Sequence, residues 1–451
     1  MLTLLKKLLS KFGVDGAIGF TLLSRIISAS GGLITLVFIA SFLTTEEQGY
    51  YYTFGSIVAI QIFFELGLNG IITQYVAHEV AHLKWGSNFK LEGNNQNLSR
   101  LSSLLHFCIK TFGAIAVILF LILSISGYVF FTKFHHGSEL ISWELPWLLV
   151  SISTTLLFLI NPLIAFIEGL GKVKDVAKLR FFQQLFNVST VSLTLIFGGK
   201  LWALGVGSFL SFIILAVGVF FTQKKRILLN IYHAIGENKI HYWNEIFPYQ
   251  WKIAVSWISG YFIFQLFNPV LFATEGPKVA GQMGMTLAVL NGISALSMSW
   301  ITTKIPKMAS LIAVQNYSVL DGLFNRTIRQ LTIVNVFMLL IFNLGVWVLH
   351  INKFGIAERF LPLFSLLLLS FVTLANQFVF SWATYLRCHK KEPYLINSIT
   401  LGFLSSISTL FIGKYYGLLG IVISYSIISI PIGMTWGFLI YKNKKSQWHT
   451  H

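Results

Sequence analysis

Four charged residues stand within or at the start of long apolar stretches of this chain: Arg25, Glu65, Lys110 and Lys252. A charge at membrane depth costs about 2.5–3.5 kcal/mol, so it persists where it is paired or faces a water-filled cavity. Three of the four are cations near one membrane face, and the single anion lies deeper. This arrangement predicts a cavity that receives an anionic group, such as a lipid-linked phosphate or diphosphate, from that face.

Each of these residues also has a structural alternative. Lys110 and Lys252 lie close enough to the membrane surface to extend their amines into water, and Glu65 would serve as the counter-ion of Arg25. Otherwise Glu65 is a candidate carrier for a proton or a sodium ion, since a carboxyl group removed from water binds a proton more readily. We therefore predict substrate contacts for Arg25, Lys252 and Lys110, and a coupling or counter-ion role for Glu65.

Uncharged polar residues at mid-depth offer a second kind of contact. Their amide groups would line a cavity and bind sugar hydroxyls, or they would form hydrogen bonds between helices worth about 0.6 kcal/mol on average. Both roles remain open for the candidates of this kind, which are Asn69, Asn268, Asn291 and Asn376.

Residues 78–82 read His-Glu-Val-Ala-His, the pattern of zinc peptidases in which two histidines bind the metal and the glutamate activates water. The pattern stands at the water-exposed end of an apolar stretch, without a dry pocket around it. We therefore predict no catalytic residues, no metal site and no enzyme. An intramembrane zinc metalloprotease built on His78, Glu79 and His82 is kept as a remote alternative.

Twelve apolar stretches must position these residues, and each is long enough for a helix to cross a hydrocarbon layer of about 30 Å. Only 11% of the residues are charged, against about 25% in a soluble domain. We predict an all-α polytopic membrane protein whose spans are 17–43, 50–77, 103–132, 143–167, 181–199, 201–222, 250–274, 280–303, 330–350, 360–386, 394–413 and 417–441.

The longest polar connection, residues 223–249, separates spans 1–6 from spans 7–12. We predict two related six-helix bundles, residues 1–235 with a short amphipathic N-terminus and residues 236–451. A weak internal match supports the repeat: Arg25 precedes Ser28 and Gly32, as Lys252 precedes Ser256 and Gly260. Prolines inside spans 4, 7 and 12 predict kinks in those helices.

Basic residues fall mainly on alternate connections. One membrane side, named the basic side below, holds both termini and 25 of the 33 Lys and Arg; the other side holds six, and Arg25 and Lys110 lie within spans. Cytoplasmic loops have such an excess, so we predict that both termini are cytoplasmic. The formal charge of +17 then reflects loops beside anionic lipid, and we predict no nucleic-acid partner.

Several segments together resemble a known family. They are Ser24-Arg25, EQGYYYTFGS, FFELGLNGIITQYVAHEVAHL, SRLSSLLHFCIKTF, FIEGLGKVKDVAKLRFFQQ, FPYQWKIAVSWISGY, and the run from AGQMGMTLAVLNGI to TTKIPKM. Over nearly its whole length the chain resembles polysaccharide flippases of the O-antigen type, which belong to the multidrug/oligosaccharidyl-lipid/polysaccharide exporter superfamily.

The resemblance implies a pair of six-helix bundles in the bacterial cytoplasmic (inner) membrane. Such a protein moves an undecaprenyl-diphosphate-linked oligosaccharide to the outer leaflet by alternating access, for O-antigen or capsule synthesis. Arg25 and Lys252 match basic positions of the family. Expected partners are the lipid-linked oligosaccharide, membrane lipids, and glycosyltransferases and a polymerase of the same pathway. No cofactor is expected beyond H+ or Na+ as a coupling ion. A drug/cation antiporter of the same superfamily is the alternative.

Overall fold

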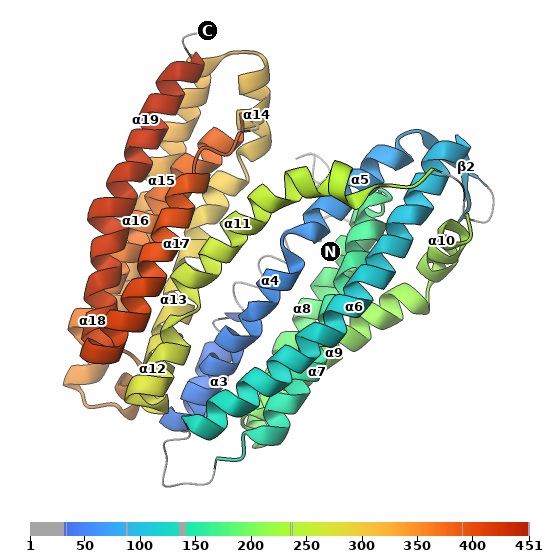
Figure 1. The fold of residues 1–451 in the computed structure, drawn as a ribbon. Helices are drawn as coiled ribbons and strands as arrows, with labels where there is room; N and C mark the ends of the chain where they lie inside the picture. Colours follow the sequence, from blue (N-terminus) through green and yellow to red (C-terminus); the bar gives the residue numbers. More distant parts are fainter. Residues whose placement is uncertain are drawn as a thin grey trace, which may run out of the picture. The chain divides into compact units, whose positions relative to one another are not determined.

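The computed structural model of the chain describes residues 31–449, except residues 33, 87–88, 135–140, 235, 237 and 390 and the side chains of residues 249 and 252. The predicted substrate residue Arg25 and the side chain of Lys252 therefore lie outside the described part. Within that part, helices dominate the fold (Figure 1). The two described strands, β1 (Leu83–Trp85) and β2 (Leu91–Gly93), form a short antiparallel hairpin.

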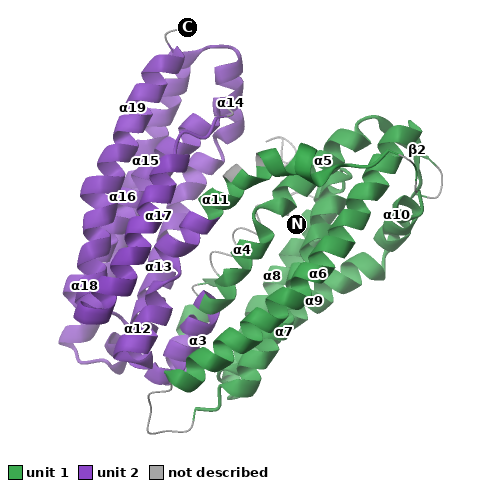
Figure 2. Ribbon diagram, in the orientation of Figure 1, with its two compact units in different colours: residues 1–38, 57–257 green, residues 39–56, 258–451 purple. Residues whose placement is uncertain are grey.

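The chain divides into two compact units (Figure 2). Unit 1 comprises residues 1–38 and 57–257, and unit 2 comprises residues 39–56 and 258–451. Most of helix α3 (Thr45–Val58) thus packs with unit 2, whereas the start of α11 (Phe247–Phe264) packs with unit 1. Division into two related bundles at residues 235 and 236 stays a prediction, and the contacts assign residues 236–257 to unit 1.

Unit 1 is built around α7, which packs against α5, α6, α8 and α9. Its side chains are apolar on nearly all faces, as in Phe158, Ile160 and Phe166, so this helix is buried on several sides. The helices of this unit are α4 (Ile62–Glu65), α5 (Leu68–Val80), α6 (Asn95–Lys133), α7 (Glu144–Gly169), α8 (Val173–Ile196), α9 (Trp202–Phe220) and α10 (Gln223–Tyr232), with a π-helical turn at Tyr242–Ile246 before α11.

Unit 2 has α13, α15 and α16 packed pairwise, with α18 against α12 and α16. Close backbone approach joins α3 to α13, because a Cβ atom on Gly49 would lie 2.0 Å from the Pro277 carbonyl oxygen. The helices of this unit are α12 (Phe267–Glu275), α13 (Pro277–Thr302), α14 (Ile305–Ala313), α15 (Tyr317–Ile351), α16 (Leu363–Arg387), α17 (Leu395–Ile407), α18 (Gly413–Ile427) and α19 (Thr435–His449), with π-helical turns at Ser408–Ile412 and Ile428–Met434.

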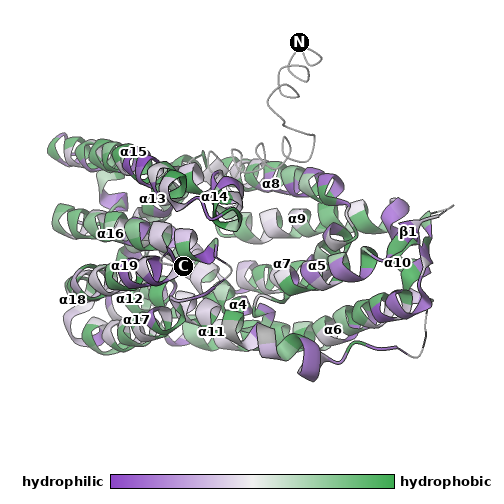
Figure 3. Ribbon diagram, turned by 90° about the horizontal axis from the view of Figure 1, so that it is seen from above, coloured by the Kyte–Doolittle hydropathy of each residue, from purple (hydrophilic) through white to green (hydrophobic). Residues whose placement is uncertain are grey.

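Nine helical stretches among the described residues are long and apolar enough to cross a membrane. The last of them, Leu395–His449, contains two predicted spans, and the backbone leaves helical geometry between them at Gly417. The remaining predicted spans are α8, whose first half is charged, and span 1, most of which lies outside the described part. Hydrophobic residues prevail along helices such as α9 and α15 (Figure 3). The predicted class, an all-α polytopic membrane protein, is confirmed.

Candidate functional site

The helix that contains Glu65 is interrupted directly after this residue. α4 ends at Glu65 and α5 starts at Leu68, while Leu66 and Gly67 have φ angles of +48° and +70°. Glycine adopts such angles at no steric cost. Gly67 also permits close approach of α11, because a Cβ atom there would lie 2.6 Å from Cγ2 of Ile253. The break therefore lies beside the turn of α11 that contains Lys252.

A hydrogen bond spans this break. Asn69 Nδ2 donates to Glu65 Oε1 at 2.6 Å. The other amide atom, Asn69 Oδ1, is buried and accepts no hydrogen bond from the described residues. Thr73 fixes the following turn by donating to the Ala165 carbonyl oxygen of α7 at 3.1 Å. The break thus holds a carboxylate and a buried amide oxygen next to α7.

Arg180 is the cation that the described residues place near Glu65. Because α8 begins at Val173, this arginine lies about 10 Å into the helix and not in the connection before it. Its Nη1 donates to Gln183 Oε1 at 3.0 Å, and its Nη2 donates to Asn161 Oδ1 of α7 at 2.9 Å. Glu65 and Glu168 both act electrostatically on this guanidinium. Among the described residues, neither forms an ion pair with it.

Two neutral amides therefore orient Arg180 without neutralising its charge. A guanidinium has five N–H donors, and side chains of the described part accept hydrogen bonds from two of its nitrogens. Its planar fork suits phosphate oxygens in a bidentate geometry. The name Arg180 cluster is used below for Glu65, Asn69, Asn161, Glu168, Arg180 and Gln183.

Lys110 lies away from the buried side of its helix. It belongs to the exposed stripe of α6, opposite the stripe of Leu104, Cys108 and Phe112. Nearby, His106 contacts the Ser102 carbonyl oxygen through Nδ1 at 2.9 Å. Within the described part of the chain, no contact joins Lys110 to the Arg180 cluster. Its predicted contact with substrate therefore stays a prediction.

The asparagines predicted in unit 2 have differing surroundings. Asn268 is 8% exposed and donates to Ser56 Oγ at 3.0 Å. Asn376 Nδ2 donates to the Tyr425 hydroxyl oxygen at 3.2 Å. Asn291 lies on an exposed part of α13. The first two side chains thus form bonds between helices, and a role in lining a cavity stays a prediction.

The His-Glu-Val-Ala-His motif is divided between two faces of α5. Glu79 is 3% exposed, accepting from Arg100 Nε and Asn97 Nδ2, each at 2.8 Å, whereas His78 and His82 are exposed. Both carboxylate oxygens are thus engaged on the side away from the histidines. Among the residues that the structure describes, no three His, Cys, Asp or Glu side chains form a group suited to a metal ion.

Arg100 also joins this end of unit 1 to the segment before α11. Its Nη2 lies 2.5 Å from Glu245 Oε2, and the Tyr75 hydroxyl donates to the Glu245 carbonyl oxygen at 2.6 Å. Partial burial raises the pKa of Glu245, but hydrogen bonds from Arg100 and the His241 backbone outweigh it and lower the pKa below its usual value. The ion pairs of Arg100 with Glu79 and Glu245 are named the Arg100 bridge below.

Solved structures with a similar fold are membrane transporters. An inward-facing multidrug resistance MATE family transporter of the MOP superfamily matches with a TM-score of 0.59 and 12% identity, over 93% of this chain and 99% of that one. The lipid II flippase MurJ, in an inward closed conformation, matches with a TM-score of 0.56 and 14% identity, over 95% and 87%. A mutant of the Vibrio cholerae MATE transporter VcmN matches with a TM-score of 0.51 and 13% identity, over 96% of this chain and 97% of that one.

No protein-family profile and no curated protein sequence matches the chain. Identities this low show a shared fold. The proteins that share it are transporters or flippases and not enzymes. The fold of this chain is therefore that of MOP superfamily transporters.

Sequence reasoning missed Arg180, Asn161 and Gln183 as site residues. It placed Arg180 in the connection before span 5, because the charges around it lower the local hydropathy. One signal was present: Gln183 follows Arg180 by three residues, which puts both on one helical face. A second was the pair of glycines after Glu65, which indicated a break in span 2.

Proposed function

We propose that this protein is an alternating-access flippase that moves a lipid-linked oligosaccharide diphosphate from the basic side of the membrane to the other side. The observation that best supports this proposal is that neutral amides orient Arg180, about 10 Å into α8, and that no carboxylate of the described part forms an ion pair with it. A purely structural arginine in an apolar bundle would be expected to pair with a carboxylate. The diphosphate would supply the missing anion.

The other predicted cations extend this site. Arg25 and Lys252 would contact the diphosphate together with Arg180, and the break in span 2 lies beside the turn of α11 that contains Lys252. Asn69, whose Oδ1 is buried and accepts no hydrogen bond from the described residues, would bind a sugar hydroxyl once the break opens to the substrate. With both termini cytoplasmic, transport would proceed from the inner to the outer leaflet of a bacterial cytoplasmic membrane, as O-antigen or capsule synthesis requires.

Glu65 would couple transport to an ion gradient. Its charge acts on Arg180, so a proton or sodium ion bound at Glu65 weakens that attraction. The guanidinium is then freer to hold the diphosphate. Release of the ion restores the attraction and favours release of the substrate. Ion and substrate thus affect each other's affinity through the Arg180 cluster.

A drug/cation antiporter is the second candidate function. The Arg180 cluster contains two carboxylates, Glu65 and Glu168, and one arginine, so its charge within the described residues is −1. A cationic substrate would be attracted to such a site. The match to MATE family transporters supports this candidate at the level of the fold.

Transport in proteoliposomes distinguishes the two candidates. The assay follows leaflet exposure of a fluorescent undecaprenyl-diphosphate oligosaccharide, with and without an imposed proton or sodium gradient, and ethidium efflux in parallel. We expect Arg180→Ala to abolish flipping and Arg180→Lys to retain part of it. Lys174→Ala, an exposed change in the same helix, is the matched control. Normal flipping by Arg180→Ala would refute the proposed site, and efflux of ethidium without flipping would favour the antiporter.

A further inference from the structure

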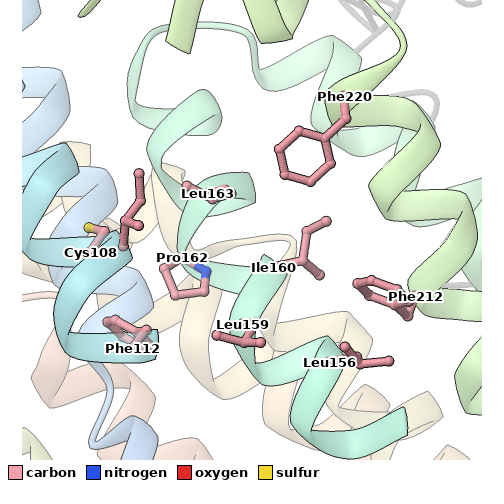
Figure 4. A pocket seen from close by; sticks show the side chains of 10 residues that line it. Cys108, Phe112, Leu156, Leu159, Ile160, Pro162, Leu163, Phe212 and Phe220 are labelled. Atoms are coloured by element: carbon pink, nitrogen blue, oxygen red, sulfur yellow. The ribbon is translucent and has the colours of Figure 1, made fainter. Parts of the chain in front are cut away.

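An apolar hollow of about 260 Å³ lies between helices of unit 1 (Figure 4). Its floor is α7 around Pro162, and its walls are α6 and α9. The side chains that define it are Ile109, Phe112, Leu159, Pro162, Phe212 and Phe220. The name α7 groove is used below for this hollow. All of these side chains are apolar, so the surface suits hydrocarbon.

The α7 groove lies apart from the Arg180 cluster. Asn161 directs its side chain to Arg180, whereas the next residue, Pro162, lines the groove. Ile109 and Phe220 in the walls are 46% and 44% exposed. In a chain that spans a membrane, such exposed apolar residues contact lipid. The groove is therefore open to the hydrocarbon layer.

A basic helix crosses one end of the α7 groove. α9 ends at Phe220, and α10 starts three residues later and packs against both α6 and α9 (Figure 1). Its far end is attached to α6, where Tyr232 stacks on His106 with ring centroids 4.0 Å apart and Ser102 Oγ donates to the Tyr232 carbonyl oxygen at 3.2 Å. Its near end therefore lies where the groove meets the membrane surface.

The first turn of α10 contains three consecutive cations, Lys224, Lys225 and Arg226. The following residues Ile227 and Leu228 are buried, which anchors this turn against the bundle. Lys225 and Arg226 are exposed on its outer side. A polar, positively charged surface thus adjoins the end of an apolar groove, as the two parts of a phospholipid require.

We propose that the α7 groove and the first turn of α10 together bind one anionic phospholipid of the basic-side leaflet. One acyl chain lies in the groove over Pro162, and the phosphate contacts Lys224, Lys225 and Arg226. The groove wall from Phe212 to Phe220 is about 12 Å long, which fits within the roughly 15 Å of one leaflet. Each cation near the surface increases attraction to anionic lipid by roughly fivefold.

The bound chain also supports the Arg180 cluster. Proline removes one backbone hydrogen bond of α7, so the helix is weakened at this turn. Hydrocarbon packed on Pro162 stabilises the turn that presents Asn161 to Arg180. The lipid acts in this way whatever the transported substrate is.

Photolabelling of the full chain in nanodiscs tests the proposal. The probe is phosphatidylglycerol with a diazirine in the middle of one acyl chain, and labelled peptides are mapped by mass spectrometry. We expect labels on α7 and α9 peptides that contain Leu159 and Phe212. Unlabelled phosphatidylglycerol competes with this labelling, and phosphatidylcholine does so at least about fivefold less well.

Two variants should lose most of the label, and two control variants should keep it. Ile109→Trp fills the groove and removes most of the label, and Arg226→Gln lowers labelling about fivefold. Arg226 is exposed, so its variant stays informative if Ile109→Trp misfolds. The controls are Leu121→Trp, on the exposed stripe of α6 outside the groove, and Lys442→Gln in α19; both keep the label.

Three results would overturn the proposal. Equal labelling of the groove and of the exposed stripe of α6 would mean an ordinary lipid annulus. Equal competition by phosphatidylcholine would show that the site does not select an anionic lipid. Displacement of the label by a polyprenyl diphosphate in preference to phosphatidylglycerol would assign the groove to a different lipid.

Discussion

The two units differ in the polar groups that they contain within the membrane. Unit 1 has Glu65, Glu168 and Arg180 within or at the ends of its spans, and amide side chains form hydrogen bonds with Glu65 and Arg180. In the described part of unit 2, the buried polar side chains of the spans are uncharged apart from Glu47 at a helix start, and the partly exposed Asp321 of α15 is paired with Lys445 at 2.8 Å. Neutral groups need only hydrogen bonds, whereas a charge needs a counter-charge, a ligand or water.

Buried amides of unit 2 join its own helices through their NH2 groups, while Asn335 Oδ1 and Gln377 Oε1 accept no hydrogen bond from the described residues. Asn335 donates to Ser297 Oγ at 3.3 Å, and Gln377 donates to the Leu331 carbonyl oxygen at 3.3 Å. These bonds join α13, α15 and α16. In unit 2 these polar groups hold helices together, whereas in unit 1 we propose that they bind a ligand. The predictions below test this contrast.

After Arg180→Ala, which should abolish flipping, the largest effect is expected from Glu65→Gln. The amide keeps the hydrogen bond to Asn69 across the break, but it cannot bind a proton or release one. We expect flipping that no longer responds to an imposed gradient, with normal protein abundance. The measurement is transport at two gradients in proteoliposomes. Wild-type gradient dependence in this variant would leave Glu65 with a structural role.

Arg100→Ala should affect stability and not the site. Removal of the arginine leaves Glu79 buried without its cation, and loss of one partner of a largely buried pair costs on the order of 2–3 kcal/mol. We expect lower abundance and an earlier thermal transition in detergent. Transport per folded molecule should stay near the wild-type value. A selective loss of transport would place the Arg100 bridge in the transport cycle.

Asn335→Leu tests the neutral network of unit 2. The side chain is fully buried, and leucine has a similar shape, so hydrogen bonds between helices of this kind predict a change of about 1 kcal/mol or less. Thermal unfolding and transport should both stay close to wild type. A loss of transport at unchanged stability would show that unit 2 also contributes to the site.

The smallest effect concerns pH at the end of α19. His389 Nε2 lies 3.3 Å from His449 Nε2, and burial lowers the pKa of His389 below its ordinary value of 6.5. The packed state therefore favours neutral His389, so this packing is stable above pH 6.5 and weakens as the pH falls below it. Hydrogen exchange of residues 435–449 should increase at pH 5.5, and His389→Ala should remove the difference between pH 5.5 and pH 8.

Hydropathy alone predicted the membrane helices, because apolar runs of about 20 residues have few other stable arrangements. It did not predict the interruption at Leu66 and Gly67, where the missing side chain of Gly67 leaves room for Ile253 of a helix distant in sequence. Arg180 was missed for a related reason. Its hydrogen-bond partner Asn161 is nineteen residues away and on another helix.

The His-Glu-Val-Ala-His motif shows the converse limit. A spacing of four residues puts His78 and His82 on one helical face, as a metal site would need. The partners of Glu79 are set by the packing of α6. Arg100 and Asn97 of that helix donate hydrogen bonds to its two carboxylate oxygens. Sequence spacing therefore identified the helix face, and tertiary packing decided its role.

The central claim is that the charged cluster of unit 1, and not the neutral network of unit 2, binds the transported lipid diphosphate. The most direct test compares flipping by Arg180→Ala and by Asn376→Ala at matched protein levels in proteoliposomes. The account predicts near-complete loss for Arg180→Ala and near wild-type transport for Asn376→Ala. Normal transport by Arg180→Ala, with loss in Asn376→Ala, would contradict it.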